Sequence, residues 1–169
     1  MVKKPALCLV CGYSNSGKTT LVEKLVAAFS ARGYLVATAK SHRGEVQTDT
    51  PGKDTWRHRK AGAIATFFVT GSEVVTFASK PAALEFSPKD LIKNCPKGTH
   101  LLLAEGFKEA EGLPRVEVLG EGQAPELREG TICVAAASPA SVSAPVPVFS
   151  RDDAQKICET IIERAMGGG

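Results

Sequence analysis

The residues from Gly12 to Thr19 have the types and the spacing of a phosphate-binding loop. They read GYSNSGKT, which fits the P-loop pattern G-x-x-x-x-G-K-[ST]. In this pattern glycines let backbone N–H groups turn inward around an anion, the lysine contacts the β- and γ-phosphates, and the hydroxyl binds Mg²⁺. We therefore expect Lys18 to be catalytic and Thr19 to hold the metal. The expected nucleotide-binding residues are Gly12, Asn15, Ser16, Gly17, Lys18, Thr19 and Thr20.

The flanks of this loop fit the strand and the helix that a P-loop joins. Residues 6–11 form an unbroken apolar run, which is typical of a strand buried on both faces of a parallel sheet. After the loop, apolar residues recur at helical spacing as far as Phe29, and Gly33 stands where a helix C-cap belongs. A helix that starts near Lys18 would point the positive end of its dipole at bound phosphates. This context favours a P-loop over a Gly/Ser turn that binds nothing.

An acidic residue at the end of a second apolar strand is expected to complete the site. The run LLLA at residues 101–104 is followed by Glu105 and Gly106. P-loop proteins place an acid at such a strand end beside the Mg²⁺ shell. We therefore predict that Glu105 binds the metal and takes part in catalysis, and that Gly106 lets the backbone approach the γ-phosphate. Because a glutamate at a strand end is common, this interpretation depends on the P-loop.

Length and composition predict one globular domain of ordinary size. The chain has 169 residues, of which 43% are hydrophobic and 23% charged. We expect one nucleotide-binding domain over residues 1–166 and a flexible tail at 167–169. The formal net charge is +3 without a long basic run, so nucleic acid is not an expected partner. No apolar run approaches the ~20 residues of a membrane span, so we expect no membrane partner and a cytoplasmic location.

The order of the elements predicts a three-layer α/β fold of the P-loop NTPase type. Residues 34–40 read as a second strand, parallel to the first through a right-handed crossover. Two β-rich runs joined by Gly71-Ser72 predict an antiparallel hairpin near residues 64–78, which we expect to make part of a mainly parallel sheet antiparallel. Ser87 and Ser150 are expected to cap later helices. Further strands are expected at residues 116–119 and 132–136.

Two other groups of residues have more than one interpretation. Cys8 and Cys11 form a C-x-x-C, but residues three apart on a strand point to opposite faces, which favours buried, unpaired thiols over a metal or redox pair. The basic run from Lys53 to Arg59 follows a long polar segment at residues 41–53. It could be a solvated helix face or a contact for an anion, and the residues leave both interpretations open.

Three sequence blocks together resemble a known family. They are the P-loop, the stretch Asp49-x-x-Gly52-Lys53-Asp54 that continues to Arg59-x-Ala61-Gly62-Ala63, and the strand end Glu105-Gly106-Phe107-Lys108. In this order they resemble the molybdopterin-guanine dinucleotide biosynthesis protein B family over nearly the whole chain. The combination is much more specific than the P-loop alone.

The resemblance implies a function. It implies a cytoplasmic homodimer that binds GTP with Mg²⁺, hydrolyses it slowly, and assists the guanylyltransferase that attaches GMP to molybdopterin in molybdenum cofactor biosynthesis. It also implies that Asp49, Lys53, Asp54 and Arg59 contact molybdopterin or the partner protein.

The chain departs from the family pattern in ways that bear on base choice and rate. Residues 40–44 keep a single histidine, Ser138-Pro139 stands where relatives often carry an aspartate, and no Asn-Lys-x-Asp guanine-reading motif is present. Guanine preference is thus implied by the resemblance alone. No glutamine or arginine is evident beside the P-loop to speed hydrolysis, although Lys53, Arg57 or Arg59 of a neighbouring subunit could supply charge.

Other function classes remain open from the residues. A P-loop small-molecule kinase needs several lid arginines, whereas residues 120–150 carry only Arg128. An ATP-dependent assembly factor and a nucleotide-responsive binding module without turnover are the remaining alternatives.

Overall fold

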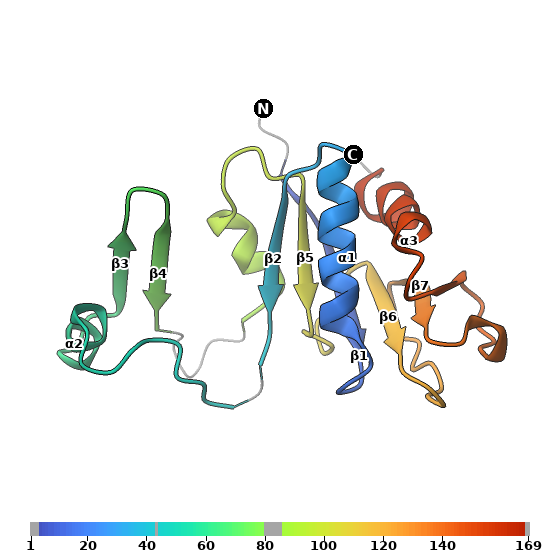
Figure 1. The fold of residues 1–169 in the computed structure, drawn as a ribbon, viewed down its shortest axis with the longest axis horizontal. Coiled ribbons are helices and arrows are strands. Elements are labelled where there is room, and N and C mark those ends of the chain that lie inside the picture. Colours follow the sequence, from blue (N-terminus) through green and yellow to red (C-terminus); the bar gives the residue numbers. More distant parts are fainter. Residues whose placement is uncertain (1–3, 43, 80–85, 168–169) are drawn as a thin grey trace. The chain divides into compact units, whose positions relative to one another are not determined.

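The computed structural model describes residues 4–42, 44–79 and 86–167, and the chain forms two compact units (Figure 1). Unit 1 comprises Met1–Ser41 and Ser87–Gly169, and unit 2 comprises His42–Phe86. Both lie within the single domain predicted from the sequence, whose extent stays a prediction. Residues 168 and 169 of the predicted tail lie outside the described residues. Among the helices that are described, none is long and apolar enough to cross a membrane.

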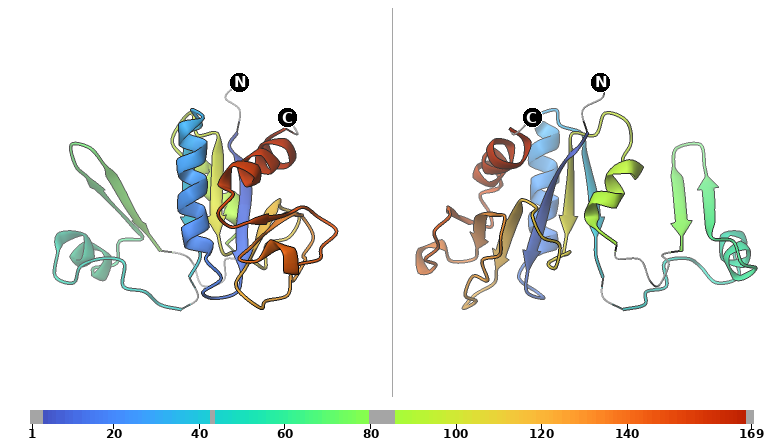
Figure 2. Two further views of the ribbon diagram at one scale, coloured as in Figure 1. Left: turned by 45° about the vertical axis from the view of Figure 1, so that its right-hand side comes forward. Right: turned by 180° about the vertical axis from the view of Figure 1, so that it is seen from behind.

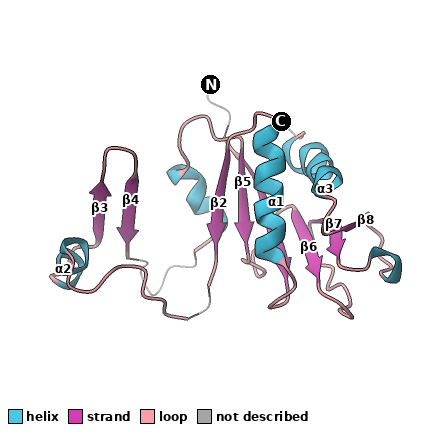
Figure 3. Cartoon of the chain, viewed as in Figure 1, coloured by secondary structure: helices cyan, strands magenta, loops and turns pink. Residues whose placement is uncertain are grey.

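Unit 1 is built on a six-stranded, parallel sheet with the strand order β2-β5-β1-β6-β7-β8 (Figure 3). The strand order runs from β1 through β5 to β2 on one side and through β6 to β7 and β8 on the other. In open α/β sheets, ligands bind outside the carboxyl ends of the strands, at the point where the strand order changes direction. The strands are β1 (Ala6–Gly12), β2 (Val36–Lys40), β5 (Leu101–Glu105), β6 (Arg115–Leu119), β7 (Thr131–Ala136) and β8 (Val148–Ser150).

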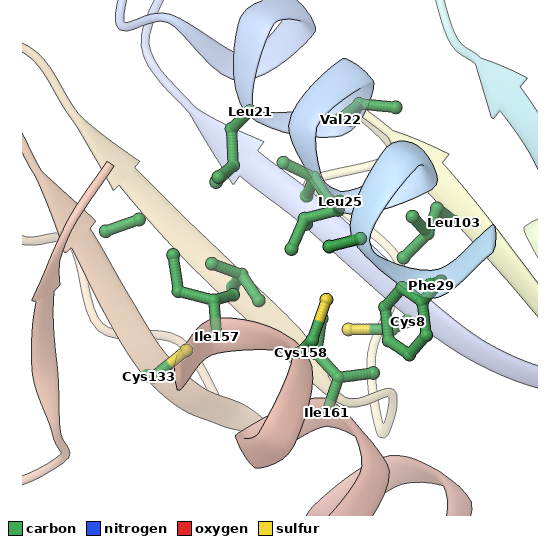
Figure 4. Close-up of a cluster of buried hydrophobic side chains, with 14 of the residues drawn as sticks. Cys8, Leu21, Val22, Leu25, Phe29, Leu103, Cys133, Ile157, Cys158 and Ile161 are labelled. Carbon is green, nitrogen blue, oxygen red and sulfur yellow. The ribbon is translucent and has the colours of Figure 1, made fainter. Parts of the chain in front are cut away.

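Two helices cover one face of this sheet, α1 (Lys18–Ala31) and α3 (Ala154–Ile161), which continues as the π-helical turn η3 (Ile162–Met166) (Figure 1). Figure 4 shows their apolar side chains against those of the strands, with Leu25, Phe29 and Ile157 fully buried. The C-cap of α1 is Arg32, and the glycine predicted to end the helix follows it: Gly33 has a φ of +81° and its N–H donates to the Ser30 carbonyl at 3.0 Å.

The opposite face is covered by a short 3-10 helix, η1 (Pro88–Asn94), and by the segment after β5 (Figure 2). The predicted cap at Ser87 is confirmed, since its hydroxyl accepts from the Lys89 N–H and its own N–H donates to Asp90. Cys8 packs on the α1 face and Cys11 on this one, so the two thiols diverge as predicted. The three layers and the mainly parallel sheet are therefore confirmed.

The segment before α3 corrects one prediction. Ser150 does not cap the last helix, because its backbone is still extended and pairs with Ala136 as the end of β8. The cap is Asp153, whose carboxylate accepts the Lys156 N–H at 3.2 Å. A strand of three residues was not predicted, since so short a run carries no periodicity.

Unit 2 contains α2 (Asp54–Lys60) and the hairpin of β3 (Ala65–Val69) and β4 (Val74–Ala78). The antiparallel hairpin is confirmed, with Phe67 opposite Thr76. The expectation that it makes part of the main sheet antiparallel is wrong, because among the described residues β3 and β4 pair only with each other. Apolar side chains stay exposed on this hairpin, among them Ile64 at 82% and Phe67 at 67%.

Candidate nucleotide-binding site

The phosphate loop between β1 and α1 has a backbone that requires glycine at two positions. Gly12 has a φ of +146°, and a Cβ there would lie 2.2 Å from the Val118 carbonyl oxygen. Gly17 has a φ of +94°, and Asn15 takes a left-handed conformation at +59°. Gly12 is therefore required by its backbone conformation and by a close backbone contact, and Gly17 by its backbone conformation, as the P-loop pattern predicts.

The amino terminus of α1 begins immediately after this loop. Lys18 is its first residue, and the Leu21 N–H donates to the Gly17 carbonyl at 3.0 Å. The first turn of α1 carries no acidic residue, so nothing on the helix itself neutralises the positive end of its dipole. The Lys18 ammonium donates to the Tyr13 carbonyl and thus lies over the loop. This arrangement suits a bound anion.

The predicted metal ligands meet beside the loop. The Thr19 hydroxyl lies 2.9 Å from Oε1 and 3.1 Å from Oε2 of Glu105, and it donates to this carboxylate. Glu105 is buried at the end of β5, where it is the register partner of Val10 on β1. Hydroxyl and carboxylate oxygens are the donors that Mg²⁺ prefers, and Mg²⁺ usually takes few protein ligands besides phosphates and water. The described residues hold no group of three or more His, Cys, Asp or Glu that could bind a metal, so this pair fits Mg²⁺ only together with phosphates.

Lys40 is a neighbour of this pair that the sequence analysis did not assign. Its Nζ lies 3.3 Å from Oε1 of Glu105 and 3.4 Å from the Thr19 hydroxyl. The sequence feature that could have identified Lys40 is its place at the end of β2, because Lys40 and Glu105 are register partners on adjacent strands. The cluster thus joins one acid, one ammonium and one hydroxyl at the carboxyl edge of the sheet.

The segment after Glu105 also requires an unusual backbone. Gly106 has a φ of +90°, and a Cβ there would lie 3.2 Å from the Cβ of Ser41. The Gly106 N–H donates to the Val10 carbonyl at 3.0 Å, which ties the segment to β1. Glycine is therefore needed at this position for contacts within unit 1, and its approach to a γ-phosphate stays a prediction.

Arg151 is a second residue beside the P-loop that the sequence analysis did not assign. Its Nη1 donates to the Ser16 carbonyl, and a Cβ on Gly17 would lie 2.5 Å from the same nitrogen. Because β8 was not predicted, nothing in the sequence placed the next residue against the loop. Ser16 itself is fully buried, and its hydroxyl has no hydrogen-bond partner among the residues that the structure describes. A buried hydroxyl without a partner in a phosphate loop agrees with a site built for a polar ligand.

Glu117 and Cys11 are buried ionisable residues that pair on adjacent strands, on the sheet face that η1 covers. Burial raises the pKa of Glu117 to about 7, the charge of Glu126 acts in the same direction, and Arg115, Arg128 and Lys18 oppose it. Burial also raises the pKa of Cys11 to about 11, so this thiol stays protonated and is a poor nucleophile. The Cys11 Sγ lies 3.2 Å from the Gly106 carbonyl oxygen.

The four site residues predicted in the second block all lie in unit 2. Arg59 lies 3.6 Å from the largely buried carboxylate of Asp49 and 5.3 Å from the centre of the Phe77 ring. Asp49 also accepts from the Thr55 hydroxyl at 3.0 Å. Lys53 and Asp54 begin α2 with exposed side chains. The structure thus brings Asp49 and Arg59 together, leaves the rest of the basic run mostly exposed, and does not place this block relative to the P-loop.

Comparison with known proteins identifies relatives over most of the chain. The family model "Molybdopterin guanine dinucleotide synthesis protein B" matches residues 7–138. The molybdopterin-guanine dinucleotide biosynthesis adapter protein of Haemophilus influenzae is 32% identical over 138 residues, which cover 79% of this chain and 75% of that protein. The Escherichia coli adapter protein is 27% identical over 161 residues, 93% of this chain and 91% of that protein. The crystal structure of Bacillus subtilis MobB superimposes with a TM-score of 0.74 at 29% identity, covering 96% of this chain and 99% of that one.

Proposed function

The chain belongs to the molybdopterin guanine dinucleotide synthesis protein B family, and from this premise we propose that it is an adapter protein of molybdopterin-guanine dinucleotide biosynthesis that binds GTP with Mg²⁺ and hydrolyses it slowly. The observation that carries the nucleotide site is the Thr19 hydroxyl on the Glu105 carboxylate, beside a loop whose backbone requires both motif glycines. Together with the amino terminus of α1, this is the donor set of an Mg²⁺-nucleotide site.

Each residue has a role in this proposal. The loop from Gly12 to Gly17 turns backbone N–H groups toward the phosphates, and Lys18 moves from the Tyr13 carbonyl to the β- and γ-phosphates. Thr19 and Glu105 would hold Mg²⁺, which neutralises charge on the β- and γ-phosphates when bound. Gly106 leaves room for the γ-phosphate, and Asn15, Ser16 and Thr20 complete the loop and the first turn of α1.

Slow hydrolysis follows from what surrounds the phosphates. The guanidinium of Arg151 contacts the loop backbone through the Ser16 carbonyl, so it does not have the position of an arginine finger on the γ-phosphate. The preference for GTP rests on the family, because the chain lacks the Asn-Lys-x-Asp motif. A small-molecule kinase or an ATP-dependent assembly factor would instead prefer ATP.

Two further parts of the proposal concern partners. The exposed apolar side chains of the hairpin, such as Phe67 and Val69, support a homodimer, because an isolated two-stranded hairpin is at best marginally stable in water. The guanidinium of Arg59, oriented by Asp49, is one-third exposed and suits the phosphate of molybdopterin or an acidic group of the partner guanylyltransferase, with Lys53 and Asp54 nearby in sequence. The cytoplasmic location stays a prediction.

The first test is calorimetric titration with GTP and with ATP, each with Mg²⁺, together with the mass from light scattering. We expect selective binding of GTP by a dimer. Preference for ATP by a monomer would support a kinase and contradict this proposal.

The variant Lys18→Ala tests the site itself. It should weaken nucleotide binding by at least roughly a hundredfold, because the ammonium that meets the phosphates is lost. Lys93→Ala, which removes an exposed lysine in η1, is the matched control and should bind like the wild type. Unchanged affinity in a folded Lys18→Ala variant would contradict the nucleotide site.

A further inference from the structure

We propose that Arg151 is a positioning residue of the nucleotide site, which fixes the Ser16–Gly17 peptide so that the Gly17 N–H faces the phosphates. The inference rests on the proposed nucleotide binding and adds to it a residue outside all three family blocks. Arg151 follows β8 directly, so its chemistry is brought to the P-loop by the fold and not by the motif.

The guanidinium of Arg151 contacts the backbone of the phosphate loop. Its Nη1 donates to the carbonyl of Ser16. The same nitrogen lies 2.5 Å from where a Cβ of Gly17 would be, and Cζ lies 3.3 Å from that point. The guanidinium therefore occupies the space beside the Gly17 Cα, where a side chain at position 17 would displace it.

The turn that carries Arg151 is itself held in place. The backbone N–H of Arg151 donates to the Ala136 carbonyl at 3.0 Å, which continues the pairing of β8 with β7. The next residue, Asp152, forms an ion pair with Lys24 on α1, and Asp153 caps α3. The backbone turn that carries Arg151 is thus anchored to the sheet and to both helices, as the support of a positioning residue must be.

Peptide geometry gives the consequence for ligand binding. In a planar trans peptide the carbonyl and the following N–H point in opposite directions. Arg151 holds the Ser16 carbonyl, so the N–H of Gly17 points away from the guanidinium, and we infer that it points to the phosphates. A fixed N–H donor binds an anion more tightly than a donor that must first be ordered.

The position of Arg151 in the strand order predicts which step depends on it. Glu105, with Thr19, marks the metal side of the loop at β5, whereas Arg151 comes from β8, on the other side of β1. Thr19 and Glu105 would hold the Mg²⁺ that neutralises charge on the β- and γ-phosphates, whereas the guanidinium of Arg151 contacts the loop backbone, so we infer that Arg151 does not act on the γ-phosphate. It should therefore affect GDP and GTP alike and leave the hydrolysis step unchanged.

The experiment compares Arg151→Ala with Arg32→Ala. Arg32 also ties α1 to α3, through hydrogen bonds to Gln155 at 2.7 Å and Glu159 at 3.1 Å, but from the C-cap of α1, far from the P-loop along the helix. Both variants are titrated with GDP and GTP in the presence of Mg²⁺, and single-turnover hydrolysis is followed at saturating GTP. For Arg151→Ala we expect the Kd of both nucleotides to rise by roughly tenfold or more, with an unchanged single-turnover rate. Arg32→Ala should bind like the wild type.

A conservative substitution separates positioning from general destabilisation. Arg151→Lys keeps one N–H donor for the Ser16 carbonyl and should restore part of the affinity. If Arg151→Ala does not fold, Arg151→Gln replaces it. Because glutamine also keeps an N–H donor, we expect a smaller rise in the Kd values of GDP and GTP.

Three outcomes would overturn the inference. Unchanged Kd values in folded Arg151→Ala would show that the contact does not order the loop. A loss limited to GTP with a slower single turnover would show that Arg151 acts on the γ-phosphate. Wild-type protein that binds neither nucleotide would overturn the proposed function as well, whereas wild-type binding with unchanged variants overturns this inference alone.

Discussion

At the scale of single residues, Glu117 is a buried acid whose ionisation opposes folding. It lies on β6 with 3% of its surface exposed, and its register partner on β1 is Cys11. Burial raises its pKa to about 7 from an ordinary value of 4.5. The native state therefore binds this proton more tightly than the unfolded chain, so stability is lost as the pH rises through this range and the full cost is present above pH 7.

Glu117→Gln removes this ionisation and should therefore remove its contribution to the pH dependence of stability. At pH 8 the variant should resist unfolding more than the wild type, by up to about 3 kcal/mol. The difference should shrink to less than about 1 kcal/mol as the pH falls towards 5, where the native carboxyl is already protonated. Urea unfolding at both pH values measures this, with the exposed Glu163→Gln as the control. An equal effect at pH 5 and pH 8 would contradict the assignment to Glu117.

The residues of the site divide into those that local sequence reveals and those that it cannot. Gly12, Gly17, Lys18 and Thr19 follow from one continuous motif, and Glu105 follows from a strand end that such a motif leads one to look for. Lys40 and Arg151 reach the loop only through strand pairing, Lys40 through its register with Glu105 and Arg151 through β8. No spacing along the chain encodes those contacts.

At the scale of elements, the packing of α1 on the sheet holds the phosphate loop. Leu25 is fully buried between this helix and the strands (Figure 4). Leu25→Ala should lower the free energy of unfolding by about 2–5 kcal/mol, because it removes buried methyl groups and leaves a cavity. Chemical denaturation measures the loss. Leu35→Ala, at a leucine that is 58% exposed, should cost much less, and equal costs would contradict this account of the core.

The elements that were predicted correctly are those with a strong local signal. The strand at β1, the helix α1 and the capping box at Ser87 each carry an apolar run, a helical period or a cap. The hairpin was found from its Gly-Ser turn, but its separate sheet was not, because pairing with a third strand depends on residues far along the chain. The cap at Asp153 was misplaced by three residues because the extended Ser150 belongs to an unpredicted strand.

At the scale of the whole molecule, the buried apolar core of the described residues lies in one unit. All members of the three hydrophobic clusters belong to unit 1. The described part of unit 2 exposes most of its large apolar side chains, including Val69 at 67% and Val74 at 66%. A unit without its own core gains little from folding alone, and the homodimer proposed above would cover this apolar surface.

Replacing residues 42–86 by a flexible Gly/Ser linker should separate nucleotide binding from the association of two chains. The remaining unit 1 keeps its clusters, the P-loop, Thr19 and Glu105, so it should unfold cooperatively and bind nucleotide within a fewfold of the wild-type Kd. Its mass by light scattering should fall from dimer to monomer, because the exposed hairpin is gone. The double variant Phe67→Ser and Val69→Ser keeps the whole chain and should also be monomeric while binding nucleotide normally. If the linker protein stays a dimer, the association surface lies in unit 1; if it fails to fold, the two units form one cooperative structure in spite of their separate contacts.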